Sequence, residues 1–134
     1  MSRTCPVCPG VRMHNSPSLF YVSFDCPPPS VNVMFANAKR GGRIKTPKYR
    51  RWLEDAAWAA RLARKEKEPL CGALHAFIEV GVPGKRRWDL DNRLKALFDA
   101  LQTGGVIEDD EQIREIHARK GSDFVGAKIE LWSA

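Results

Sequence analysis

The stretch WDLDNRLKALFDALQTGGVIEDDEQI, residues 88–113, decides the architecture expected of this chain. Its apolar residues recur at the spacing of one helix face, at Leu94, Leu97, Phe98 and Leu101. Asp91 or Asn92 is well suited to cap the start of that helix, and the pair Gly104-Gly105 predicts its end. The stretch therefore places one amphipathic helix between two groups of acidic residues.

Directly before the helix, Asp89 and Asp91 stand two residues apart. If this segment leaves a strand in an extended conformation, side chains two residues apart project to the same side, whereas on a helix they diverge. Two parallel carboxylates repel each other, and a divalent cation between them relieves the repulsion. Lys95 lies one turn into the helix, so its ammonium group can reach the space over the carboxylates. Asp99 is expected to be an i, i+4 partner of Lys95.

Directly after the helix, residues 108–111 are Glu-Asp-Asp-Glu. Four successive acids are typical of a solvated turn, but a turn between a helix end and a strand also offers metal ligands. Mg²⁺ prefers oxygen ligands and keeps several waters, so the two earlier aspartates with Asp109, Asp110 or both would suffice. Such an ion polarises a scissile phosphate and generates hydroxide from bound water. Lys95 would then stabilise charge on the phosphoryl oxygens.

The rest of the chain predicts four strands and a second helix. Alternating or β-branched segments predict strands at 18–25, 72–80, 113–120 and 125–132. Thr46-Pro47 predicts a helix start and Pro69 its end. Strand 72–80 is expected to be covered on one side only, so that His75 is a surface or structural histidine rather than a ligand. The expected fold class is mixed α/β (α+β), a single mixed sheet of about four strands with two main helices packed on it.

The charge balance favours a polyanionic partner. Lys and Arg number 22 against 16 acids, which gives a net charge of +6 and an isoelectric point near 9.4. Residues 30–45 predict a long, mobile, basic loop, which is either a contact to a nucleic-acid backbone or a solvated linker. The candidate DNA-binding residues come from this loop and from the segment around the first acidic group: Asn32, Lys39, Arg40, Arg43, Lys85, Arg86, Arg87 and Asn92.

The N-terminal residues differ in character from the rest. Residues 1–17 predict an irregular extension, and residues 18–134 a single domain. The extension holds Cys5-x-x-Cys8, which has zinc-knuckle spacing but no second such pair after it. Another ligand would have to complete a metal site, from among Cys26, Cys71 and His14. The plainer interpretation is an exposed tail with two incidental thiols.

The cellular compartment follows from the cysteine pattern and the apolar runs. Four cysteines at these spacings do not form the disulfide framework of a secreted protein. No apolar segment has the length of a signal-peptide core or of a membrane span. We therefore expect a cytoplasmic protein with no membrane partner.

Residues 86–113 resemble the RusA family of Holliday-junction resolvases, small endodeoxyribonucleases of bacteria and their phages. The resemblance runs from about Ser18 to Trp132 and includes the turn Pro28-Pro29-Ser30 with Asn32 nearby. By matching position, it implies that the Mg²⁺ ligands, for which Mn²⁺ is a substitute, are Asp89, Asp91 and Asp110, with Asp109 beside them. It also implies that Lys95 is required for cleavage.

The same resemblance implies a homodimer that acts on four-way DNA junctions in recombination and repair. The family nicks two opposed strands symmetrically. A junction with two-fold symmetry is most simply matched by an isologous dimer that carries one active site in each subunit.

Three other interpretations compete with this one. A non-catalytic branched-DNA-binding protein would use the acids only as caps, and the intact acid set with Lys95 argues against it. A restriction-like nuclease needs an acid followed two residues later by lysine, but Glu79 and Glu130 are followed at that distance by Gly81 and Trp132. A glycosyltransferase-type DxD motif fails on size, because no nucleotide-binding fold fits before the motif.

Overall fold

The predicted strands form one four-stranded sheet in a computed structural model that describes residues 17–65 and 67–134. The strands are β1 (Phe20–Phe24), β4 (Leu74–Gly81), β5 (Ile113–Lys120) and β6 (Gly126–Ser133), in the order β1-β6-β4-β5. β4 and β5 run parallel, and β6 runs antiparallel to both β1 and β4. Because β4 and β5 are parallel, the chain between them must cross back over the sheet.

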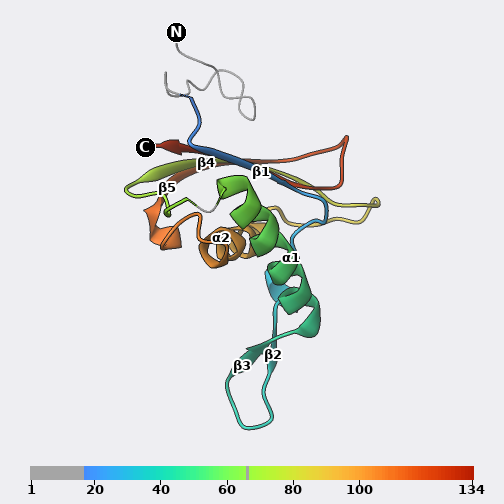
Figure 1. Cartoon of the computed structure of the whole chain (residues 1–134). Coiled ribbons are helices and arrows are strands. Elements are labelled where there is room, and N and C mark those ends of the chain that lie inside the picture. The colour runs from blue at the N-terminus through green and yellow to red at the C-terminus, as the bar shows by residue number, and fades with distance from the viewer. Residues whose placement is uncertain (1–16, 66) are drawn as a thin grey trace.

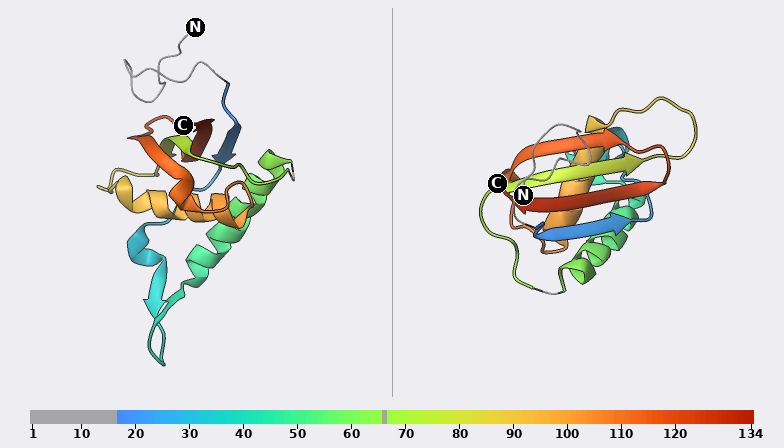
Figure 2. Two further views of the ribbon diagram at one scale, coloured as in Figure 1. Left: turned by 90° about the vertical axis from the view of Figure 1, so that its left-hand side faces the viewer. Right: turned by 90° about the horizontal axis from the view of Figure 1, so that it is seen from above.

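Two helices, α1 (Pro47–Arg64) and α2 (Leu94–Thr103), lie against the same face of this sheet (Figures 1 and 2). The prediction of a mixed sheet with two main helices is therefore confirmed. The strands alternate as expected, and the helix-facing side chains Val22, Ile78 and Ile129 are almost entirely buried. α2 lies in the crossover between β4 and β5, so one acidic group precedes it in the chain and the other follows it.

The start of α1 follows the sequence signal. The side chain of Thr46 accepts a hydrogen bond from the Tyr49 amide at 3.2 Å, and Pro47 occupies the first turn. The helix ends at Arg64, before Pro69, with Lys65 in the left-handed conformation at its C-cap. The predicted helix is confirmed, although it is shorter than the position of Pro69 suggested.

The glycine pair after α2 sets how closely the two helices pack. Gly105 has φ of +77°, a conformation that favours glycine, so the predicted helix end is confirmed. A Cβ atom on Gly104 would lie 2.7 Å from the Ala57 carbonyl oxygen and 3.0 Å from the Ala60 methyl group. Only glycine therefore lets the C-terminal end of α2 contact α1 at this distance.

The expectation of a long, mobile loop over residues 30–45 is wrong. This segment contains a short turn η1 (Val31–Val33) and an antiparallel ribbon of β2 (Phe35–Asn37) and β3 (Arg43–Lys45). Two consecutive glycines, Gly41 and Gly42, both with positive φ, allow the chain to reverse at the tip. The ribbon projects away from the sheet and helices (Figure 1).

Contacts to α1 hold the base of the ribbon in place. The Phe35 ring packs edge-on against Tyr49 at 5.9 Å between centroids. The Thr46 hydroxyl donates to the Val33 carbonyl at 2.7 Å. The prediction failed because these stabilising contacts come from the following helix rather than from the segment itself.

The expectation that β4 is covered on one side only is also wrong. On the face away from the helices, His75 is 7% exposed and Phe77 3%. The Phe77 ring packs edge-on against Trp132 of β6 and stacks on His117 of β5, with centroids 4.7 and 5.0 Å apart. Rings from three adjacent strands therefore bury this side of β4, which the pattern of a single strand does not reveal.

In the described part of the chain, no helix combines the length and apolarity needed to cross a bilayer.

Candidate active site

The segment that carries Asp89 and Asp91 is not extended. β4 ends at Gly81, and Leu90 between the two aspartates already has helical angles, φ −63° and ψ −44°. A short turn η2 (Asp91–Arg93) then leads into α2. The expectation that the two carboxylates project together from an extended segment is therefore wrong. Leu90 packs against the core, and this packing turns the chain one residue earlier than the motif alone indicates.

The predicted cap at the start of α2 is absent as well. Neither η2 nor α2 has a side-chain hydrogen bond at its N-cap, because η2 continues directly into α2. The side-chain amide of Asn92 lies 3.4 Å from an Asp89 carboxylate oxygen instead. Both aspartates are exposed. The Asp91 carboxylate is therefore not used as a helix cap and is exposed to solvent. It lies near the N-terminal end of α2, where the helix dipole is positive.

Lys95 connects this end of α2 to the second acidic group. Its ammonium nitrogen lies 3.1 Å from Asp99 Oδ1 and 3.2 Å from Asp110 Oδ2. The predicted pair with Asp99 is confirmed, and the contact with Asp110 joins residues 15 positions apart. The hydrogen bond to Asp99, followed by that to Asp110, raises the pKa of Lys95 above its usual value despite partial burial.

The two aspartates of the second acidic group, residues 108–111, have different roles. It forms a short turn η3 (Asp110–Gln112) with Asp109 as N-cap, whose carboxylate accepts the Glu111 amide at 2.9 Å. The Gln112 side chain closes the capping box by accepting the Asp109 amide at 3.2 Å. Gln112 also donates to the Leu70 carbonyl at 2.8 Å, which fixes the turn to the segment before β4. Asp109 therefore stabilises the turn, while Asp110 faces Lys95.

Asp110 contacts Lys95, but the carboxylates of the two acidic groups are not gathered into one ligand cluster. Within residues 17–65 and 67–134, the one group of potential ligands whose atoms all lie within 4.8 Å of one another is elsewhere, at His75, Glu115 and His117. Asp89, Asp91 and Asp110 are hard oxygen donors at the solvent-facing end of α2, which suits an ion that retains part of its water shell. Lys95 currently supplies the positive charge beside Asp110.

Asp99 has a second partner that the sequence pattern did not indicate. The Tyr49 hydroxyl of α1 donates to Asp99 Oδ2 at 2.6 Å, while Lys95 contacts the other oxygen. Tyr49 is fully buried, and burial together with the Asp99 carboxylate raises the pKa of its hydroxyl well above the ordinary value. Asp99 thus ties Lys95 to α1. The pair is separated by 50 residues, so only the packing of the two helices reveals it.

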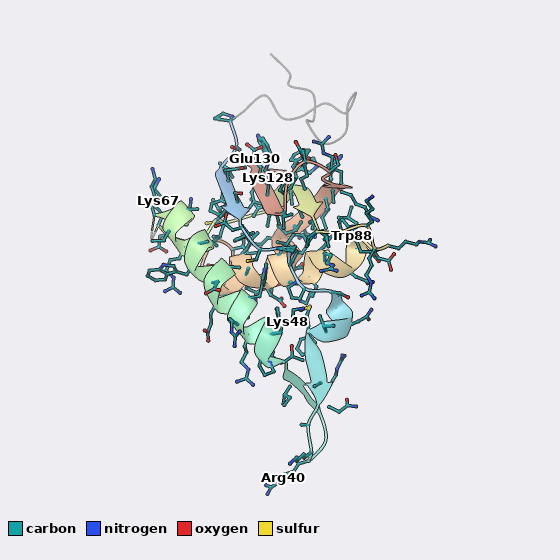
Figure 3. The ribbon with its side chains drawn as sticks, turned by 90° about the vertical axis from the view of Figure 1, so that its right-hand side faces the viewer. Arg40, Lys48, Lys67, Trp88, Lys128 and Glu130 are labelled. Atoms are coloured by element: carbon teal, nitrogen blue, oxygen red, sulfur yellow. The ribbon has the colours of Figure 1, made fainter. Side chains whose placement is uncertain are left out.

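Most of the candidate DNA-binding residues are exposed cations in two places. Lys39 and Arg40 lie at the tip of the ribbon (Arg40 is labelled in Figure 3), and Arg43 of β3 stacks over the Phe35 ring at 5.2 Å. The exposed run 85–87 lies in the loop between β4 and η2. Asn32 is exposed in η1 and Asn92 is half-buried in η2.

The residue before the motif, Trp88, lies beside the N-terminal end of α2 (Figure 3) and is contacted by two cations. Lys120 of β5 lies over its ring at 4.6 Å, and Arg93 at 5.8 Å. Lys120 also donates to the Trp88 carbonyl. The chain directly before the aspartates is therefore fixed to β5 at Trp88.

A basic cleft that the sequence did not indicate adjoins this end of α2. Its volume is about 430 Å³, and it is lined by Cys26, Pro27, Pro29, Lys48, Arg51, Trp52 and Arg93. Arg93 donates to the Pro28 carbonyl at 2.8 Å, which holds the proline turn against η2. Burial lowers the pKa of Arg93, although arginine stays protonated at physiological pH. Three separate segments build this cleft, so no local motif marks it.

Comparison with known proteins identifies the family of the chain. The model of the family described as Endodeoxyribonuclease RusA matches residues 25–131, which contain both acidic groups and Lys95. A protein of Aquifex aeolicus named crossover junction endodeoxyribonuclease RusA is 33% identical over 95 residues, or 67% of this chain and 75% of that protein.

Two further relatives carry the same name. That of Enterobacteria phage HK97 is 33% identical over 108 residues, covering 78% of this chain and 85% of the phage protein. That of Escherichia coli is 43% identical over 54 residues, 40% of this chain and 45% of the relative. With a family match over most of its length and two relatives at 33% identity, this chain belongs to the RusA family of endodeoxyribonucleases.

Proposed function

We propose that this nuclease is a Mg²⁺-dependent, structure-selective endodeoxyribonuclease that resolves four-way (Holliday) junctions by paired symmetric nicks. The observation that carries the proposal is the ion pair between Lys95 and Asp110, because it joins α2, which directly follows the first acidic group, to the second acidic group. The names of the relatives, crossover junction endodeoxyribonucleases, support the choice of substrate. Such an enzyme acts on DNA in the cytoplasm of a bacterium, whether encoded by the bacterium or by a phage.

The proposed catalytic residues are Asp89, Asp91, Asp110 and Lys95. The three carboxylates would hold Mg²⁺, with Mn²⁺ as a substitute, and Asp109, which caps the turn, is the further proposed ligand. When bound, the ion supplies Lewis acidity and an activated water. Lys95 holds its proton, since its pKa is raised, and donates to the phosphoryl oxygens as negative charge develops on them.

The proposed DNA path uses the cations on either side of the carboxylates. The ribbon tip with Lys39 and Arg40 and the run 85–87 offer phosphate contacts, and phosphates supply much of the affinity of such proteins. Arg43, Asn32 and Asn92 are the remaining proposed contacts. The basic cleft near Arg93 adds Lys48 and Arg51 to this surface.

Two nicks at one junction require two active sites, and each subunit offers one set of catalytic residues. We therefore propose a homodimer with two-fold symmetry that matches the symmetry of the junction. The dimer is part of the functional proposal, and sedimentation of the protein with and without a four-way junction would test it directly.

The proposed function is tested with a labelled four-way junction and a linear duplex of matched sequence, each incubated with the protein with and without Mg²⁺. The expected result is cleavage of the junction alone, only with the metal, and at symmetric positions on opposed strands. The non-catalytic alternative predicts that the junction is bound but stays intact under both conditions. Equal cleavage of the duplex would contradict structure selectivity.

Asp99→Asn is expected to slow cleavage about tenfold with little change in junction affinity, because Lys95 loses the carboxylate that ties it to α1. Removing this partner also lowers the pKa of Lys95, so activity should fall at a lower alkaline pH than in the wild type. Single-turnover rates across the alkaline range measure both effects. Tyr49→Phe is the matched comparison, since it leaves the Lys95–Asp99 pair in place and should retain most activity. An unchanged pH profile for Asp99→Asn would contradict the positioning role.

The double variant Lys39→Ala/Arg40→Ala is expected to weaken binding of every junction sequence to a similar extent. Each lost phosphate contact reduces the slope of log affinity against log salt by about 0.9, so the slope should fall by roughly 1.8. Titration at several salt concentrations measures it. The control is Arg61→Ala/Lys67→Ala at the other end of α1, where Lys67 is labelled in Figure 3. Equal losses in both double variants would show that only net charge matters.

A further inference from the structure

Two imidazoles and a carboxylate meet on neighbouring strands, away from the proposed catalytic residues. His75 of β4 and Glu115 and His117 of β5 each bring one ligand atom to within 4.8 Å of the other two. The sheet register accounts for this, because His75 pairs with Glu115 and Phe77 pairs with His117. The two imidazole rings lie 5.1 Å apart between centroids. Two paired strands, rather than a loop, therefore hold all three side chains.

These side chains lie on the face of the sheet that the helices leave uncovered. His75 stands between Leu74 and Ala76, which are both fully buried on the helix side, so its own side chain projects from the opposite face. Figure 2 (right) looks down on this face, with α1 and α2 behind the sheet. The proposed catalytic lysine belongs to α2, so the two sets of residues lie on opposite sides of the sheet.

The cluster is enclosed on one side and open on the other. The side chain of His75 is 9% exposed, whereas that of Glu115 is 61% exposed. The Phe77 ring stacks on His117 and packs edge-on against the buried Trp132. A cation held by the three side chains would have aromatic rings beside it and solvent on the side of Glu115. A water molecule can therefore complete its coordination.

The side chains need only a small movement to bind one ion. The Glu115 carboxylate already contacts Nε2 of His75, and a metal ion takes the place of a proton at such a pair. Ligand atoms on one tetrahedral Zn²⁺ are about 3.3 Å apart, given bonds of about 2.0 Å. The separations in the cluster exceed this value by no more than about 1.5 Å. Rotation of the exposed Glu115 side chain and of the half-buried His117 can supply that movement.

The donor atoms favour Zn²⁺ over Mg²⁺. Two imidazoles with one carboxylate form a known type of three-ligand zinc site, in which water takes the fourth position, whereas Mg²⁺ prefers oxygen ligands. Cys5 and Cys8, which the sequence also offers as metal ligands, lie outside the described part of the chain. The three described side chains form the site without them.

We propose that His75, Glu115 and His117 bind one Zn²⁺ ion on the outer face of the sheet, with water as the fourth ligand. The ion joins β4 to β5, the parallel pair on either side of the crossover, and so stabilises the folded chain. The site shares no residue with the proposed nuclease centre. Its tests therefore measure metal binding and stability, and their outcome is independent of whether the protein cleaves DNA.

Histidine ring signals in NMR spectra of the full-length protein, produced without a histidine tag, report the site directly. On addition of Zn²⁺, the ring signals of His75 and His117 should shift together in one titration step. The variants His75→Gln and His117→Ala assign the two signals. Failure of both signals to respond to zinc would overturn the site and leave the contact between His75 and Glu115 as an ordinary ion pair.

Competition with a chelator of known affinity, followed on the His75 signal, gives the zinc affinity of each variant. His117→Ala should lower it by more than about 100-fold, since loss of a direct ligand exceeds the effect of losing a surrounding partner. Glu115→Gln, a change at an exposed side chain, should lower it by about tenfold or more. Glu130→Gln of β6 is the matched control and should bind zinc as the wild type does. Circular dichroism without zinc establishes that each variant is folded.

Thermal unfolding provides a second measurement. With free Zn²⁺ about 100-fold above the dissociation constant, the Tm of the wild type should rise by about 5 to 10 °C. Glu130→Gln should show the same rise, and His117→Ala at the same zinc concentration should show little. Unchanged zinc affinity in both Glu115→Gln and His117→Ala, or an equal loss in Glu130→Gln, would overturn the assignment of these ligands.

Discussion

Replacing Asp91 with Asn is expected to reduce junction cleavage by at least about 10³ while junction binding persists. A bound metal ion contributes several kcal/mol of transition-state stabilisation, of which about 4 kcal/mol would correspond to this loss of rate. Asp91 is the aspartate of the motif that begins η2, and no helix cap occupies its carboxylate. The substitution preserves size, so the local fold should not change. Single-turnover cleavage in Mg²⁺ and a binding titration without metal measure the two effects separately.

Junction affinity of this variant should equal or slightly exceed that of the wild type, because one negative charge near the phosphates is removed. Asp55→Asn, an exposed aspartate of α1, is the matched control and should cleave normally. If Asp91→Asn nicks at the normal rate in saturating Mg²⁺, Asp91 is not a metal ligand. If it loses binding as well, its role is structural.

Replacing Lys95 with Ala is expected to lower the cleavage rate by about 10² to 10³, which is the range for losing one group that stabilises transition-state charge. The residue pairs with Asp99 and Asp110 at once, so its removal also leaves two neighbouring carboxylates without a cation. Mg²⁺ affinity should therefore stay the same or rise, while the rate at saturating metal falls. Rates measured across a Mg²⁺ titration separate these effects.

The pH dependence provides an independent check on Lys95. Its pKa is raised, first by the Asp99 hydrogen bond, so the protonated form is favoured in the folded protein. The ammonium group and its ion pairs are then fully present below the usual lysine pKa and are lost only as pH rises through the higher folded value. Wild-type activity should thus show no loss from Lys95 at pH 7 to 9. Lys67→Ala is the control, and unimpaired cutting by Lys95→Ala would remove this lysine from the mechanism.

Local patterns in the sequence were sufficient for the regular elements. The spacing of Leu94, Leu97 and Leu101 predicts α2, and all but Leu94 are fully buried. Thr46 and Pro47 predict the start of α1 because capping involves only the next few residues. Strand 113–120 begins and ends at the predicted residues. In each case the determining interactions lie within one turn or one strand.

Other features depended on residues far apart in the chain. The glycines and cations of residues 35–45 resemble those of a mobile loop. The contacts that stabilise the ribbon come instead from the start of α1, outside the segment. The packing of Leu90 bends the aspartate motif out of the extended form. Tyr49 reaches Asp99 across two helices. Neither hydrophobic periodicity nor the spacing of residues within one segment predicts any of these contacts.

The sequence by itself determined the helices, the alternation of the strands and the family to which the chain belongs. The tertiary structure alone decided which aspartate of the second acidic group meets Lys95 and which one caps the turn, and it alone placed His75 beside His117. The physical reason is the range of the interactions. Hydrophobic periodicity and capping act between near neighbours in the chain, whereas ion pairs and ligand clusters join side chains that only strand pairing and helix packing bring together.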